Sequence, residues 1–198
     1  ASVLVVTAVV ILVLGLQHAD DVIIGDADEG LPELRQQSRY NIDTRTIADS
    51  FSIGVDLITV IVETVPDASI NHSVMDLIDE FQWRISQVEG VSSTISLPQV
   101  ARILAAAWSE GSPKWRELPR NSAMLMQSTN RIETATGLLN SDASVLPVLI
   151  FTEDHRAETI ERVTAAVEQF QEDFGREDAR FRLATGNVGV MAATNQVV

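Results

Sequence analysis

The chain has 198 residues, of which 28 are acidic and 14 basic, giving a formal net charge of −14, and it contains no cysteine. The excess of acid repels phosphate groups and argues against nucleic acid as a partner. The lack of cysteine excludes disulfides, thiol catalysis and thiolate metal sites.

The first sixteen residues (ASVLVVTAVVILVLGL) carry no charge. A helix that crosses the hydrocarbon core needs about 20 apolar residues, and sixteen reach only ~24 Å. We therefore expect residues 1–17 to be the end of a transmembrane helix that starts upstream. A signal peptide is disfavoured because no Lys or Arg precedes Arg35, whereas a buried strand or core helix stays open as an alternative. The six acids between His18 and Glu33 favour a non-cytoplasmic position for the domain beyond them.

Residues 18–50 are predicted to be a connector, because Asp, Gly and Pro surround a single short apolar stretch at 22–24. A first strand-helix-strand unit is then expected in residues 51–98. Alternating apolar residues from Phe51 lead into a β-rich run that ends at Pro66, which predicts a strand.

Ser73 and Asp76 resemble a capping box at the start of the helix in this unit. Apolar residues then recur at spacings of three and four as far as Gly90, which predicts an amphipathic helix that stops there. Residues 91–97 alternate again before Pro98 and predict a second strand parallel to the first, as in a βαβ unit.

Residues 99–144 are predicted to be a helical insert. Its first helix would bury a face that is defined by apolar residues at helical spacing, namely Val100, Ile103, Leu104 and Ala107. Gly111 and Pro113 are expected to end this helix, and a second helix is expected from Ser122 to Leu139.

Residues 145–187 repeat the strand-helix-strand pattern. Val145 to Glu153 is a strongly apolar strand, Asp154 is expected to cap the following helix, and Gly175 to close it. Residues 179–184 form the last predicted strand. The nearly uncharged stretch 188–198 is predicted to approach a second transmembrane helix.

These two units predict an α+β, ferredoxin-like (split βαβ) domain over residues 51–187. In such a fold both unit helices cover one face of a four-stranded sheet. The helical insert would separate the two units.

Six short segments of the chain are typical of one group of transporters. They are residues 30–35 (GLPELR), 38–41 (SRYN), 114–120 (KWRELPR), 154–159 (DHRAET), 183–187 (LATGN) and 190–195 (VMAATN). Together they resemble the first extracytoplasmic, porter loop of MmpL-like exporters in the RND superfamily.

The resemblance implies a periplasmic domain of a bacterial inner-membrane transporter that exports or shuttles lipids or other hydrophobic substrates. It implies that the partners are the membrane, the remaining transmembrane helices and a second periplasmic loop of the same protein. It also implies that transport is driven by protons, with the proton-relaying acids in transmembrane helices outside this chain. Whether the chain forms a homo-oligomer stays open.

The sequence indicates no enzyme, cofactor or metal site. His155 stands between Asp154 and Arg156, where we interpret the charged cluster as the start of a helix rather than as a general base. His18 and His72 have no second histidine at metal-ligand spacing. No serine occupies a Gly-x-Ser-x-Gly motif, so a hydrolase lacks its nucleophile.

The candidate substrate-path residues are large adaptable apolar side chains in the insert, namely Trp108, Trp115, Met124 and Met126. The alternative is that the tryptophans are buried against the helices of the insert or lie near the membrane interface. The basic cluster Lys114, Arg116 and Arg120 has three alternative partners: a neighbouring acidic loop, an acidic substrate head, or local carboxylates such as Glu110 and Glu117.

We therefore expect a transporter domain. The rival hypothesis is a membrane-anchored binding or assembly module with no transport role.

Overall fold

The computed structural model describes residues 7, 34–35, 37–50 and 56–184. The helices are α2 (Arg39–Ser50), α3 (His72–Ile85), α4 (Leu97–Trp108), α5 (Ser122–Thr129) and α6 (Ala157–Phe174), with the 3₁₀ helices η1 (Ala68–Ile70), η2 (Pro113–Trp115) and η3 (Thr134–Thr136). The strands are β1 (Asp56–Thr64), β2 (Val91–Ile95), β3 (Val145–Thr152) and β4 (Ala179–Ala184).

The predicted transmembrane ends, residues 1–17 and 188–198, lie outside the described residues except for Thr7. Within the described ranges, no helix is both long enough and apolar enough to cross a bilayer.

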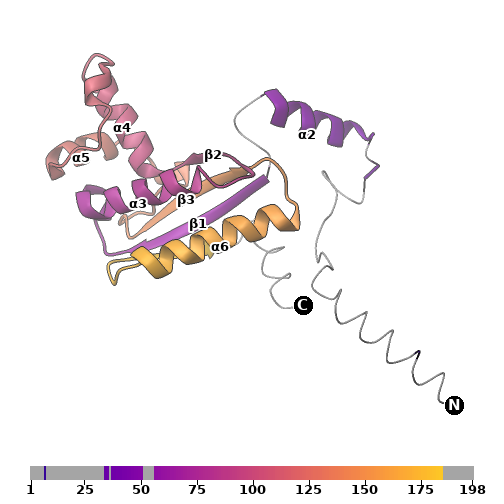
Figure 1. The fold of residues 1–198 in the computed structure, drawn as a ribbon. Helices are drawn as coiled ribbons and strands as arrows, with labels where there is room; N and C mark the ends of the chain where they lie inside the picture. Colours follow the sequence, from indigo (N-terminus) through magenta and orange to yellow (C-terminus); the bar gives the residue numbers. More distant parts are fainter. Residues whose placement is uncertain (1–6, 8–33, 36, 51–55, 185–198) are drawn as a thin grey trace.

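The four strands form one antiparallel sheet in the order β2-β3-β1-β4. β1 pairs with β3 and β4, and β2 pairs with β3. Because both β1 and β2 run antiparallel to β3, they are parallel to each other with β3 between them. In the same way, β1 separates β3 from β4. Each strand-helix-strand unit thus receives one strand of the other unit, and the predicted α+β class is confirmed (Figure 1).

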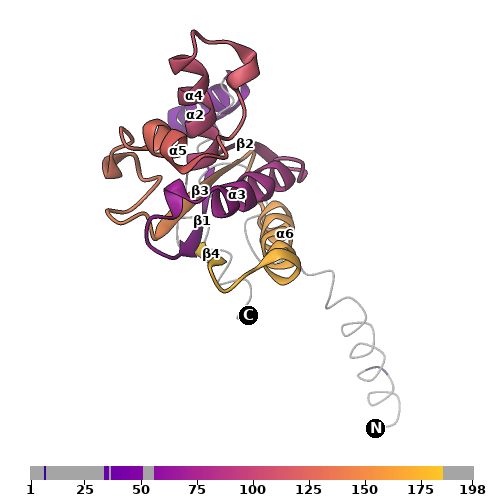
Figure 2. The same ribbon diagram turned by 90° about the vertical axis from the view of Figure 1, so that its left-hand side faces the viewer.

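α3 and α6 lie side by side on one face of the sheet (Figures 1 and 2). The strands turn alternate side chains toward them, since Ile58, Val60 and Val62 of β1 are almost completely buried. The Phe81 ring of α3 lies 5.0 Å from that of Phe170 in α6 and 4.7 Å from that of Phe181 in β4, measured between centroids. Burying such a ring contributes about 2–3 kcal/mol, so this cluster is a main contact between the helices and the sheet.

The insert packs against the rest of the domain at its base. α4 contacts α3 and β3, and α5 contacts both α4 and η1. Leu97, Ala101 and Leu125 belong to the central hydrophobic core, while the far end of α4 projects away from α6 (Figures 1 and 2). The insert therefore shares the core of the domain and is not a separate unit.

The start of α3 differs from the prediction. Asn71 is the N-cap, and its side-chain oxygen accepts a hydrogen bond from the Ser73 amide at 3.0 Å. The predicted capping box of Ser73 and Asp76 is therefore wrong. The helix also ends at Ile85, before the predicted stop at Gly90.

Two further helix predictions are corrected, and one helix lies where none was predicted. α5 ends at Thr129, not at Leu139. α6 begins after Arg156, and Asp154 instead accepts a hydrogen bond from the Arg156 amide in the preceding turn. Helix α2 lies within the predicted connector, residues 18–50, where the sequence analysis had placed no helix. The strand predictions are closer, since β3 ends one residue before Glu153 and β4 has the predicted bounds.

Candidate functional site

Helix α4 is apolar on two sides. The side that it buries in the core includes Leu97, Ala101 and Ala105. Of the predicted core-facing side, Ile103 is 49% exposed and Ala107 is exposed, whereas Val100 packs against the core and Leu104 is half-buried. We call the exposed apolar residues of α4 the outer stripe, and its members are Ile103, Ala107 and Trp108. The predicted burial is therefore wrong for Ile103 and Ala107 but not for Val100.

The other predicted substrate-path residues are also exposed. Trp115 and Met126 are each 50% exposed and Met124 is 42% exposed. The interpretation that Trp108 and Trp115 are buried against the insert helices is therefore wrong. Met124 and Met126 are two positions apart on α5 and so project to different sides of that helix. The structure thus brings Trp108 near η2, which contains Trp115, but does not gather all four residues in one pocket.

Each exposed tryptophan of the insert has a cation beside its ring. The Arg131 guanidinium carbon lies 4.8 Å from the Trp108 ring centroid, and the Lys114 ammonium lies 5.8 Å from that of Trp115. These distances fall within the range of cation–π attraction. Sequence patterns could not indicate the Arg131 contact, because a whole helix, α5, separates the two residues along the chain.

The cations of the insert are not neutralised locally. We call Lys114, Arg116, Arg120 and Arg131 the insert cations. None of them forms an ion pair with a carboxylate of the described residues, although seven other arginines do so, one of which, Arg102, also lies in the insert. The interpretation that Glu110 and Glu117 neutralise this cluster is therefore wrong. An acidic chain thus presents a basic and apolar surface at one end.

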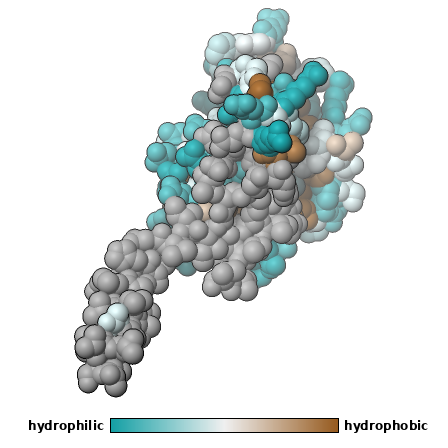
Figure 3. Space-filling view, turned by 90° about the vertical axis from the view of Figure 1, so that its right-hand side faces the viewer, coloured by the Kyte–Doolittle hydropathy of each residue, from teal (hydrophilic) through white to brown (hydrophobic). Residues whose placement is uncertain are grey.

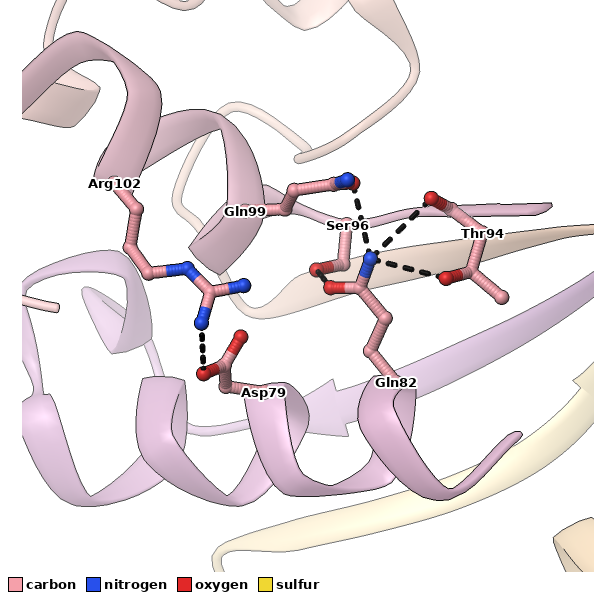
Figure 4. A network of polar contacts seen from close by, with 6 residues as sticks. All are labelled: Asp79, Gln82, Thr94, Ser96, Gln99 and Arg102. Atoms are coloured by element: carbon pink, nitrogen blue, oxygen red, sulfur yellow. Dashed lines mark hydrogen bonds and ion pairs between the residues drawn. The ribbon is translucent and has the colours of Figure 1, made fainter. Parts of the chain in front are cut away.

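A polar hollow of about 460 Å³ lies between α3, β2 and α4. Its centre is Gln82, which is 6% exposed. The Gln82 amide nitrogen donates to the Thr94 hydroxyl at 3.1 Å and to the Gln99 side-chain oxygen at 3.0 Å, and its amide oxygen accepts from the Ser96 hydroxyl (Figure 4). One buried side chain thus ties α3 to β2 and to the first turn of α4.

An ion pair lies beside this network. The Arg102 guanidinium on α4 donates to Asp79 Oδ2 on α3 at 2.7 Å (Figure 4). The second oxygen, Oδ1, is buried and has no hydrogen-bond partner among the residues that the structure describes. Burial raises the pKa of the Asp79 carboxyl despite Arg102, and the carboxylates of Asp76 and Glu80 raise it further.

The hollow therefore fastens the insert to the domain. The groups that face one another there are amides, hydroxyls and one ion pair, and they do not form a nucleophile with its base. Trp83 is 62% exposed at the rim, where it also borders an apolar groove of about 280 Å³ between α3 and α6. Gln82 could not be predicted from the sequence, because a single glutamine on an amphipathic helix carries no motif.

His155 lies at the end of the sheet. Its Nδ1 is 3.3 Å from Asp56 Oδ2, so the ring is held near the first residue of β1. In the described ranges, no three acidic or histidine side chains are placed to hold a metal ion. His155 therefore links β1 to the loop that follows β3, just before α6 begins.

In the face that Figure 3 shows, hydrophobic residues appear as separate patches between hydrophilic ones. The chain matches no protein family and no curated protein.

Proposed function

We propose that this chain is a periplasmic, porter-like domain of an MmpL-like transporter of the RND superfamily in the bacterial inner membrane. The observation that carries the proposal is the strand order β2-β3-β1-β4, with α3 and α6 together on one face. This order agrees with a ferredoxin-like (split βαβ) fold, in which each unit encloses a strand of the other.

The insert supports a hydrophobic substrate. Its outer stripe and Trp115 are exposed although the core could bury such side chains, and exposed apolar patches mark surfaces that bind lipids or proteins. We propose that this surface borders the path of a lipid or another hydrophobic substrate. The domain itself performs no chemistry, and proton coupling belongs to the transmembrane helices of the full-length protein.

A labelling experiment tests the proposed location. The chain has no cysteine, so Gln127→Cys on the exposed surface of α5 introduces the one thiol of this domain, in a full-length protein whose cysteines outside the domain, if any, are replaced by serine. We expect a membrane-impermeant maleimide to label this thiol in intact spheroplasts that express the full-length protein. Val148→Cys, in the buried core, is the matched control and should stay unlabelled until the protein is denatured. Labelling of Gln127→Cys only after lysis of the inner membrane would contradict the proposal.

A further inference from the structure

The polar hollow between α3, β2 and α4 has hydrogen-bonding groups that the described residues leave unused. On the α4 wall, Gln99 gives its side-chain oxygen to Gln82, but its side-chain nitrogen donates to no described residue. Arg102 uses one guanidinium nitrogen for Asp79 at 2.7 Å, and its other N–H groups form no hydrogen bond within the described ranges (Figure 4). The α4 wall therefore presents free donors to the hollow.

The α3 wall presents acceptors. Asp76 lines the hollow, is exposed, and forms no ion pair with a described residue. Glu80 lies on the same wall and keeps one oxygen on Arg84 at 2.7 Å. Two buried oxygens of lining residues, Asp79 Oδ1 and Ser93 Oγ, have no partner in the described part of the chain. Donors on one helix thus face acceptors on the other.

This arrangement suits a neutral ligand with several hydroxyl groups. A hydroxyl donates one hydrogen bond and accepts two, so one group can accept from Arg102 while it donates to Asp76. An anion would be repelled by three carboxylates, those of Asp76, Asp79 and Glu80. A polyamine would leave the donors of Gln99 and Arg102 without acceptors.

An exposed aromatic ring lies at the rim of the hollow. Trp83 is 62% exposed, although burying such a ring would contribute about 2–3 kcal/mol. The C–H groups on the face of a pyranose ring are apolar and can pack flat on an indole, while the hydroxyls at its edge reach polar walls. The volume of about 460 Å³ lies within the range of about 300–1,000 Å³ for small-molecule sites.

We propose that the hollow binds a neutral, soluble saccharide of one or two pyranose rings. The sugar stacks on Trp83 and is hydrogen-bonded between Asp76 on α3 and the donors of Gln99 and Arg102 on α4. It thereby adds a link between the insert and the rest of the domain. The inference goes beyond the proposed function and does not depend on it, because no residue of the outer stripe lines the hollow.

The test measures binding of glucose, galactose, N-acetylglucosamine and maltose to the 198-residue chain by saturation-transfer NMR. We expect saturable binding of at least one of these sugars. Trp83→Ala should weaken that binding about tenfold, because the stacking surface is lost. Asp76→Ala should weaken it about threefold, through the loss of one hydrogen bond. Both residues are exposed, so both variants should keep the thermal unfolding temperature of the parent chain.

Two matched controls locate the site. Trp108→Ala removes another exposed tryptophan, which does not line the hollow, and should leave sugar binding unchanged. Gln169→Ala changes an exposed residue that lines the apolar groove between α3 and α6 but not the hollow, and it should also have no effect. Weakening by Trp83→Ala and Gln169→Ala without weakening by Asp76→Ala would place the sugar in that groove and overturn the inference.

The other outcomes are equally decisive. Binding that Trp83→Ala and Trp108→Ala weaken equally would show nonspecific stacking on exposed indoles and overturn the inference. Binding that neither Trp83→Ala nor Asp76→Ala weakens would overturn it as well, and so would the failure of all four sugars to bind. Binding of putrescine in place of the sugars would show that the hollow takes cations. None of these results bears on the proposed function, which concerns the fold and the outer stripe.

Discussion

Asp79 shows how burial can outweigh a close ion pair. Its carboxylate has Arg102 at 2.7 Å, yet burial and two neighbouring carboxylates raise its pKa. One oxygen receives the guanidinium and the other is buried without a described partner, so the charged form is only half compensated. The ionised side chain therefore lowers the stability of the folded state relative to its neutral form.

This imbalance has a pH signature. A carboxyl whose folded pKa is raised stabilises the protein below its unfolded pKa, and that stability is lost as the pH rises through the folded pKa. The difference in unfolding free energy between the parent chain and Asp79→Asn should therefore decrease as the pH rises above 3.8. Urea unfolding at a series of pH values measures this difference.

Asp142 provides a control of opposite sign. Hydrogen bonds from Ser144 lower the pKa of the Asp142 carboxyl. The ionised carboxylate therefore stabilises the folded protein above the unfolded pKa, and this stabilisation is lost as the pH falls through the folded pKa. The unfolding free energy of the parent chain minus that of Asp142→Asn should therefore increase with pH. If the corresponding difference in unfolding free energy for Asp79→Asn does not change with pH, or increases with pH, burial does not raise the pKa of Asp79.

Among the elements, α4 shows most clearly what periodicity cannot decide. Apolar residues occupy most of its circumference, so the spacing of Val100, Ile103, Leu104 and Ala107 predicts a helix but not the side that it buries. The core accepts Ala101 and Ala105, whose small side chains allow close approach to α3 and the sheet. The choice of face depends on packing with distant elements, and it creates the outer stripe.

The cap of α3 gives a test at this scale. Asn71→Ala removes the side-chain acceptor of the Ser73 amide and should lower the free energy of unfolding by about 1 kcal/mol. Ser73→Ala removes an exposed contact with Arg176 and should lower it by less than about 0.5 kcal/mol. Urea unfolding measures the free energies of both variants. A larger loss of unfolding free energy in Ser73→Ala than in Asn71→Ala would indicate that Ser73 is the N-cap, as the sequence predicts.

Strands were more predictable than helix ends. β1, β3 and β4 alternate between buried and more exposed residues, and this period of two is visible in the sequence. α2 has no such signal, since Tyr40, Ile42 and Ile47 are all exposed. A helix without a buried apolar face leaves no periodic pattern, so its existence could not be predicted from hydrophobic spacing.

For the whole molecule, the two strand-helix-strand units were sufficient to predict an α+β sheet with both helices on one face. The contacts of the insert were not predictable, because they join residues that are distant in sequence. Arg131 reaches Trp108 across α5, and Gln82 reaches Gln99 across β2. The sequence thus offered Trp108, Trp115 and the neighbouring Lys114 as candidates, but not the contact of Arg131 with Trp108 or the network around Gln82.

The central claim is that an apolar chain contacts the outer stripe of the insert. Its most direct test is quenching of tryptophan fluorescence by a neutral amphiphile that carries bromine atoms on its acyl chain. The chain has three tryptophans, so Trp83→Phe with Trp115→Phe leaves Trp108 as the reporter, and Trp108→Phe with Trp115→Phe leaves Trp83. Both reporters are at least half exposed, which equalises their access to solvent. We predict saturable quenching of Trp108 and none of Trp83, whereas equal quenching of the two, or quenching of Trp83 alone, would contradict the claim.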